Sequence, residues 1–318
     1  MNKDDLQRSL DSYLAIREAL GFRMHTTRIL LTDFVGYLSA NALSGPIRAQ
    51  MAVDWATSGS TTRGPGGQAA RLSQVRGFLS FLRASAPETE IPDQRLLAST
   101  RRPLPYLFTP AEIAKLLEGA ATMKPQDSLR PILWRTLLGL LASTGLRVGE
   151  ALRLKIGDVL LLADPPHLRI IETKFRKSRL VPLHPATAQH LRHYEEQRKR
   201  LGYGALSDYF FISESGNSLR PACVWLSFRR LTRRLGILPR DGGRKPCLHC
   251  LRHTFAIERL REWHRLEMDV QALIPNLSVY LGHLGPEETY WYLTATPELL
   301  TAAAEKFQRY AEEEGAAS

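Results

Sequence analysis

Apolar residues recur every three or four positions through the first hundred residues, which is the spacing of amphipathic helices. The first predicted helix ends at Gly21 and has an apolar stripe made of Leu6, Leu10, Tyr13, Leu14, Ile16 and Leu20. The second predicted helix is capped by Thr26 or Thr27. The third opens at Pro46, and the fourth follows a Ser/Thr/Gly/Pro-rich loop at 58–67. No strand precedes this loop and no Lys-Ser or Lys-Thr follows it. The pattern therefore favours a linker between helices over a phosphate-binding loop, with contact to a DNA backbone as the alternative.

The helical periodicity stops between residues 87 and 110, where prolines and charged residues follow one another without a repeat. A segment of this kind is typical of a domain boundary. We therefore expect a helical domain over 1–98, a linker over 99–107 and a second domain over 108–318.

The second domain has a mixed pattern. The dipeptide Thr109-Pro110 is a helix start signal, and helical periodicity covers about 109–122 and 128–144. Short β-like runs separated by turn-forming residues follow over 157–183. The remainder is again helical, apart from the stretch YFFIS and two loops. The predicted fold class is mainly α with one small β-sheet.

Charge is concentrated in one part of the chain. The 318 residues carry a formal net charge of +11, and residues 171–252 hold 17 basic and 6 acidic side chains. This segment has a surplus equal to that of the whole chain, which predicts that it faces a polyanionic partner. A hydrophobic fraction of 44% is ordinary for a globular protein. The surplus does not indicate a membrane protein, because no apolar run approaches the roughly 18 residues of a spanning helix.

The expected compartment is the cytoplasm. The first residues, MNKDDLQRSLDSYL, are polar and acidic, unlike a signal peptide. Three cysteines, an odd number in a long chain, are most simply explained by a reducing environment.

The first segment that can carry chemistry is STGLRVGEALRLKIGDV, residues 143–159. Thr144-Gly145 breaks one helix, and Arg147 stands at the start of the next. An arginine in the first turn is unfavourable to the helix dipole, so this position makes sense for a guanidinium aimed at an anion. The alternative is a solvated surface arginine.

The second segment, IIETKFRKSRLVPL, spans residues 170–183. Its strand-like ends and polar middle predict a β-hairpin. The tip would hold Lys174, Arg176, Lys177 and Arg179. A basic hairpin tip suits a nucleic-acid groove, and an exposed charged turn is the alternative.

The third segment, CLHCLRHTFAIERL, spans residues 247–260. His249 and Arg252 are three residues apart, so they share one face of the predicted helix. The spacing of Cys247 and Cys250, with His249 and His253 beside them, also resembles a zinc site. However, only one further cysteine exists and no second ligand pair follows at finger spacing, so buried small apolar cysteines are favoured.

The fourth segment, SVYLGHLGPEETYWYLTATPELL, spans residues 278–300. Leu281-Gly282 is a helix-ending signal, and His283 follows it. A short helix then opens and carries Tyr290 and Tyr292. In isolation, such a histidine can be a cap and such tyrosines can be core residues.

In this order and at this spacing, the four segments resemble the tyrosine recombinase (phage integrase) family across residues 108–300. The first four helices resemble, less specifically, the family's core-binding domain. The resemblance assigns the catalytic positions to Arg147, Lys174, His249, Arg252, His283 and the nucleophile Tyr292, with Glu150 in a supporting acidic position. Phe175-Arg176 replaces the usual small turn after the lysine, so Lys177 remains an alternative to Lys174. Tyr290 likewise remains an alternative nucleophile.

The resemblance implies transesterification at a DNA phosphodiester, with a 3′-phosphotyrosyl intermediate and a free 5′-hydroxyl. It implies no metal and no nucleotide cofactor. In this scheme the two arginines bear the transition-state charge, His249 accepts a proton, Lys174 protonates the leaving 5′-oxygen and His283 orients the phosphate. The implied partners are double-stranded DNA, further copies of the chain in a tetramer on paired sites, and other recombinases or accessory proteins.

The segment TYWYLTATPELL resembles recombinases of bacterial mobile elements, which favours integration or transposition. Xer-like chromosome or plasmid resolution and a related nicking-closing topoisomerase are the alternatives. A DNA-binding regulator with a degenerate site is disfavoured because every catalytic position is filled. A metal-dependent transposase would need three carboxylates. The end of the chain, 296–314, predicts an amphipathic helix that docks either on a neighbouring protomer or on its own domain.

Overall fold

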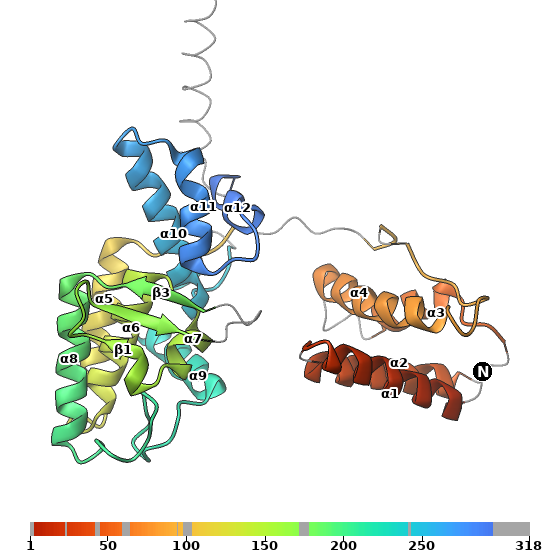
Figure 1. The fold of residues 1–318 in the computed structure, drawn as a ribbon, viewed down its shortest axis with the longest axis horizontal. Coiled ribbons are helices and arrows are strands. Elements are labelled where there is room, and N and C mark those ends of the chain that lie inside the picture. The colour runs from red at the N-terminus through yellow and green to blue at the C-terminus, as the bar shows by residue number, and fades with distance from the viewer. Residues whose placement is uncertain are drawn as a thin grey trace, which may run out of the picture. The chain divides into compact units, whose positions relative to one another are not determined.

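A computed structural model gives the fold of the chain, which divides into two compact units, Met1–Arg102 and Pro103–Ser318 (Figure 1). The structure describes residues 3–22, 24–41, 45–58, 64–93, 95–97, 104–171, 178–240 and 243–294. The described residues of the first unit form one apolar core, and those of the second unit form a main core and a smaller one. The fold class is confirmed, since the described residues are mainly helical and contain one small sheet.

The described part of the first unit contains the four predicted helices. They are α1 (Lys3–Ala19), α2 (His25–Ala40), α3 (Ala49–Thr57) and α4 (Pro65–Leu82). Their apolar faces meet in one core, in which Leu10, Phe34, Trp55 and Phe78 are almost completely buried. The helices therefore form through burial of the stripes that the sequence displays.

Two details of these helices differ from the prediction. Ile16 and Leu20 are exposed, because residues spaced by four, Leu6, Leu10 and Leu14, already form the buried face of α1. Met24 occupies the position before α2, so neither predicted threonine caps that helix.

The second unit carries the remaining elements. They are α5 (Pro110–Ala121), α6 (Arg130–Thr144), α7 (Val148–Arg153), a 3-10 turn (Ile156–Asp158), β1 (Val159–Leu160), β2 (His167–Ile170), β3 (Arg179–Pro182), α8 (Pro185–Arg200), α9 (Pro221–Arg234), α10 (Leu248–Arg265), α11 (Val270–Leu281) and α12 (Glu287–Thr294). The predicted helices at 109–122 and 128–144 correspond to α5 and α6.

The start of α5 shows why the local sequence signal works. Thr109 Oγ1 accepts a hydrogen bond from the Glu112 backbone N–H at 3.1 Å, and the Glu112 carboxylate accepts from the Thr109 N–H at 2.9 Å. Pro110 occupies the first helical position, where a missing N–H costs nothing. This reciprocal cap fixes where the unit's first helix begins.

The three strands form one antiparallel sheet in the order β1-β2-β3. Leu168 of β2 pairs with Val159 of β1 and with Val181 of β3. Leu168, Ile170 and Val181 are buried and belong to the main core of the unit. Strand β3 also contacts helix α11, because Arg179, the first residue of β3, bonds the backbone of Tyr280.

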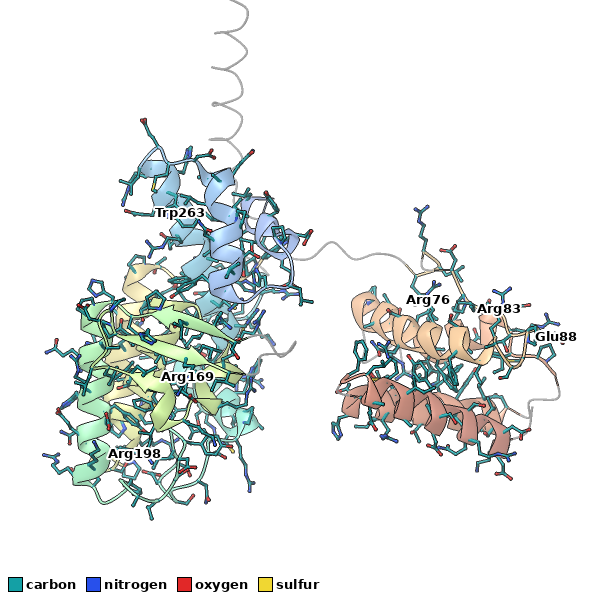
Figure 2. The ribbon with its side chains drawn as sticks, in the orientation of Figure 1. Arg76, Arg83, Glu88, Arg169, Arg198 and Trp263 are labelled. Atoms are coloured by element: carbon teal, nitrogen blue, oxygen red, sulfur yellow. The ribbon has the colours of Figure 1, made fainter. Side chains whose placement is uncertain are left out.

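The apolar run YFFIS at 209–213 lies in the core but forms only isolated β-bridges. The side chain of Arg198 at the end of α8, labelled in Figure 2, is buried against this loop. Its guanidinium donates to the backbone oxygens of Ser207 at 2.6 Å and Tyr209 at 2.7 Å. The loop carbonyls are thus satisfied by a side chain rather than by a strand partner.

Helix α10 joins the two cores of the second unit. Its first turns, with Leu248 and Leu251, pack into the main core beside α6. Its later turns, with Ile257 and Leu260, pack against α11 and α12 in a smaller core. The middle of α10, with Arg252 and His253, therefore lies between two packed cores. Among the described residues, no helix is both long and apolar enough to cross a membrane.

Candidate active site

Three arginines from separate elements converge on the end of α11. They come from the residue before α7, from β3 and from α10. All three donate to backbone carbonyl oxygens. Arg179 Nε donates to that of Tyr280 at 2.7 Å and Arg252 Nη2 to that of Leu281 at 2.7 Å. Arg147 Nη2 donates to that of Gly282 at 2.8 Å. The last carbonyls of a helix have no partner within the helix and carry its negative end, so they suit guanidinium donors.

Gly282 allows this close approach. It ends α11 in the left-handed conformation, with φ at +70°, as the Leu281-Gly282 signal predicts. A Cβ at this position would lie 2.6 Å from Arg179 Nη1 and 3.3 Å from Arg147 Nη1. A side chain here would therefore displace the arginines as well as strain the backbone.

Glu150 is the acidic partner of two of these arginines, Arg147 and Arg179. Its carboxylate, 2% exposed, accepts from Arg179 Nη2 at 2.8 Å and from Arg147 Nη1 at 3.1 Å. It also accepts from the Arg147 backbone N–H at 3.1 Å. Burial alone would raise the pKa of Glu150, but the bonds and charges of Arg179 and Arg147 outweigh it and leave the pKa below its usual value. The carboxylate is therefore ionised at neutral pH.

Arg252 is the most deeply buried of the three arginines. Its Nη1 also donates to the Gly145 oxygen at 2.9 Å, where Gly145 ends α6 with φ at +62°. Burial lowers the pKa of Arg252 to about 10, and the positive charge of Arg147 acts in the same direction. The guanidinium therefore remains charged at neutral pH, held between two backbone carbonyls.

The two candidate tyrosines on α12 have opposite environments. Tyr292 is 2% exposed, and its hydroxyl shares a hydrogen bond of 3.1 Å with His253 Nδ1. The ring of His283 stacks on it, with centroids 6.2 Å apart and planes at 20°. Tyr290 is 42% exposed. Of the two hydroxyls, only that of Tyr292 lies among the histidines of the site.

The histidines come from two elements. His249 is exposed on the first turn of α10, and its ring meets that of His253 at 4.5 Å between centroids. His283 lies in the turn between α11 and α12, where its Nδ1 hydrogen-bonds Thr289 Oγ1 at 2.7 Å. Its Nε2 lies 3.8 Å from a carboxylate oxygen of Glu288. Both elements thus place a histidine against Tyr292: α10 places His253 there, and the turn before α12 places His283.

The structure gathers every predicted site residue that it describes. These are Arg147, Glu150, His249, Arg252, His283 and Tyr292. Lys174 lies outside the described residues, as do Lys177 and the predicted helix over 296–314. Two residues were missed by the sequence reasoning. Arg179 was predicted at a hairpin tip but lies in β3 against Glu150, and His253 was considered only as a zinc ligand.

Arg179 illustrates a signal that the sequence did contain, since it stands two residues before the buried Val181 and on the same face of β3. Among the described residues, no three His, Cys, Asp or Glu side chains gather in a way that could hold a metal ion.

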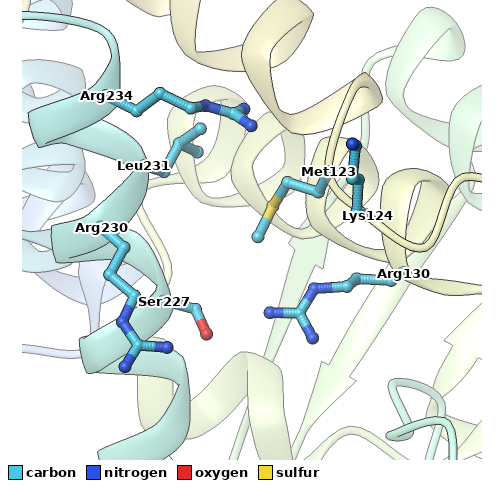
Figure 3. Close-up of a pocket in the computed structure, with 7 residues that line it drawn as sticks. All are labelled: Met123, Lys124, Arg130, Ser227, Arg230, Leu231 and Arg234. Carbon is cyan, nitrogen blue, oxygen red and sulfur yellow. The ribbon is translucent and has the colours of Figure 1, made fainter.

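A second basic feature lies between α6 and α9, where seven residues line a hollow of about 140 Å³ (Figure 3). Four of them are cationic: Lys124, Arg130, Arg230 and Arg234. The Arg130 side chain points across the hollow toward α9, the helix that carries Ser227 and Arg230. No acidic residue is among the seven, so this hollow, here called the basic hollow, can accept an anion.

Replacing Glu150 by alanine should destabilise the second unit by about 3–5 kcal/mol, because it leaves buried arginines without their counter-charge. Urea unfolding at pH 7 measures this. Glu150→Gln, which keeps the shape, should cost less. Since the folded pKa is lowered, the stabilisation by ionised Glu150 is present above about pH 4.3 and is lost as the pH falls further. Equal stability of all three proteins at pH 7 would contradict the prediction.

Comparison with known proteins identifies the class to which this fold and site belong. Residues 107–298 match the phage integrase family. The chain therefore belongs to this family, the tyrosine recombinases.

Curated relatives match over much of the chain. It is 38% identical over 308 residues to the putative integrase/recombinase y4rB of Sinorhizobium fredii, covering 95% of this chain and 97% of that protein. It is 32% identical to a tyrosine recombinase of Pseudothermotoga lettingae, covering 71% of this chain and 69% of that protein.

Solved structures share the fold. The XerH recombinase bound to its palindromic difH substrate matches with a TM-score of 0.68 and 20% identity, over 96% of this chain and 85% of that one. The Tn1549 transposon integrase in complex with transposon right end DNA matches with a TM-score of 0.68 and 16% identity, over 95% and 99%. The lambda integrase tetramer bound to a Holliday junction has a TM-score of 0.62 and 19% identity, over 90% and 76%.

Proposed function

We propose that this chain is a site-specific recombinase that cuts and rejoins double-stranded DNA through a 3′-phosphotyrosyl intermediate on Tyr292. The observation that carries the proposal is the Tyr292 hydroxyl, held by His253 beside the arginine cluster. A phenol of pKa about 10 is a weak nucleophile unless a neighbour accepts its proton or cations stabilise the phenolate. The arginine cluster and a pair of contacting histidines, His249 and His253, both lie on this side of the second unit.

Arg147 and Arg252 are assigned to the non-bridging oxygens of the scissile phosphate. Guanidinium groups bind such oxygens bidentately and stay charged at any working pH. Glu150 and the Gly282 carbonyl fix Arg147 before DNA arrives, and the Gly145 and Leu281 carbonyls fix Arg252. Preorganised charge of this kind is usually the largest contribution to transition-state stabilisation.

Proton transfers are assigned to the remaining groups. His249, on the exposed first turn of α10, is the proton acceptor, while His253 positions the Tyr292 hydroxyl. Lys174 is assigned as the acid for the leaving 5′-oxygen, and His283 as a hydrogen-bond donor to the phosphate. The phosphotyrosyl bond retains the energy of the broken ester, so rejoining requires no nucleotide.

The test is covalent capture on a nicked suicide substrate in EDTA and without ATP. We expect a protein–DNA adduct, because fixed cations supply the charge that a metal ion would otherwise supply. An adduct that disappears with the chelator and returns with Mg²⁺ would contradict this mechanism and favour a metal-dependent transposase.

For the biological role we propose integration or transposition of a mobile element. The likeness to the Tn1549 transposon integrase and to the integrase/recombinase y4rB supports it. We further propose that the protein works on cytoplasmic, nucleoid DNA as a tetramer on paired sites, with residues 1–98 as the core-binding domain. Relaxation of a supercoiled plasmid without exchange between paired sites would instead indicate a nicking-closing topoisomerase.

A further inference from the structure

Two cysteines begin the helix that carries the candidate catalytic residues. Cys247 stands at the N-terminal cap of α10 in an extended conformation, and Cys250 lies one turn further on. Their Sγ atoms are 2.9 Å apart. Cys247 is half-buried and Cys250 is buried, so the first thiol is the more accessible one.

This geometry suits a disulfide. A disulfide bond is about 2.05 Å long, so closing the pair requires a relative movement of less than about 1 Å. Residues three apart at a helix start also lie on one face, which aligns the two side chains. The pair can therefore be oxidised without unfolding α10.

The two thiols differ in acidity. A hydrogen bond from the Cys250 thiol lowers the pKa of Cys247 to about 6 against the effect of burial, with help from the backbone N–H groups of Cys250 and His249 and from the charge of Arg244. The same bond and burial raise the pKa of Cys250. Cys247 is therefore the more acidic thiol and the nucleophile of the pair, and Cys250 is the resolving thiol.

We propose that Cys247 and Cys250 form a redox switch whose disulfide lowers the rate of DNA strand cleavage. The oxidant is hydrogen peroxide. The Cys247 thiolate attacks one peroxide oxygen, the O–O bond breaks, and a sulfenic acid and a hydroxide ion form; the hydroxide takes from solvent the proton that the thiol had released and becomes water. The Cys250 sulfur then attacks the Cys247 sulfur, the S–O bond breaks, and a second water leaves. Two thiols and one peroxide thus give one disulfide and two waters.

The link to cleavage is the position of the pair, and it rests on the proposed function. His249 lies between the two cysteines, and Arg252 follows two residues after Cys250. Disulfide closure tightens the turn that carries His249 and removes the thiolate that accepts its backbone N–H. A displacement of about 1 Å in a catalytic group can lower a rate by about 10²-fold.

The experiment uses the full chain and limited hydrogen peroxide, quenched with catalase. Peptide mass spectrometry should show a linked Cys247–Cys250 pair that has lost two hydrogens. Adduct formation on the nicked substrate should fall at least tenfold and return with dithiothreitol. Cys247→Ser and Cys250→Ala should cleave DNA within a few-fold of the reduced wild type and ignore peroxide. Cys223→Ser, at an exposed cysteine in α9, is the matched control and should respond like the wild type.

The outcomes separate the two proposals. Absence of the linked pair overturns the switch, and so does a linked pair with unchanged cleavage. The switch is also overturned if peroxide still lowers adduct formation by the Cys247→Ser protein. If the reduced wild type forms no adduct at all, the proposed function fails, while the mass measurement still decides whether the dithiol closes.

Discussion

Tyr292→Phe should form no covalent DNA adduct, whereas its binding to DNA should stay within a few-fold of the wild type. Removing the hydroxyl removes the attacking oxygen and one hydrogen bond to His253, but leaves the ring packed in the small core. Denaturing electrophoresis of a labelled suicide substrate measures the adduct, and a melting curve confirms that the variant is folded. The expected loss is complete within the detection limit.

Tyr290→Phe is the matched control for this experiment. Tyr290 stands two residues away on the same helix and is exposed, so its loss should leave adduct formation nearly unchanged. An active Tyr292→Phe protein together with an inactive Tyr290→Phe protein would move the nucleophile to Tyr290. It would also mean that the turn around His283 changes when DNA binds.

DNA binding should weaken by about 10³–10⁵ between 50 and 200 mM salt, the response expected for six to ten phosphate contacts. The positive surplus of residues 171–252 motivates this expectation. Part of that charge is turned inward, because Arg198 and Arg252 are buried on backbone carbonyls. Arg229, Arg230 and Arg233 of α9 are exposed and free to approach a polyanion. A flat salt response would mean that this surface does not meet DNA.

A pair of substitutions locates the contacts. Arg230→Ala removes a cation from the basic hollow and should reduce the slope of log affinity against log salt by about 0.9 if that group holds one phosphate. Lys199→Ala on α8 is the control. Lys199 is exposed and paired with Glu195 at 2.7 Å, so its removal should leave the slope unchanged. Equal slopes for all three proteins would exclude the hollow from the DNA contact.

The helices of both units could be predicted because each depends on a local periodic stripe. Errors occurred where tertiary contacts decide. Ile16 and Leu20 continue the apolar pattern but lie off the face that the unit buries. The run YFFIS interrupts the helices as predicted, but the sequence did not indicate that Arg198 satisfies carbonyls of this loop. No local pattern encodes that long-range bond.

The candidate site also has a part that local sequence predicts and a part that depends on tertiary contacts. Residues such as Arg147 and Tyr292 could be found because they stand in ordered segments with characteristic spacing. Arg179 could not be given its partner, since Glu150 is 29 residues away and faces it only after β3 and α7 meet. The carbonyl oxygens that hold the arginines have no signature at all, because every residue carries one.

That shared anchor has a mechanical consequence. Arg147, Arg179 and Arg252 are all tethered to the main chain of residues 280–282, so a displacement of this one turn moves three positive charges at once. Helix α12, which carries the proposed nucleophile Tyr292, packs against α11, the helix that ends at this turn. We expect a force applied there to move the three guanidinium groups and Tyr292 together.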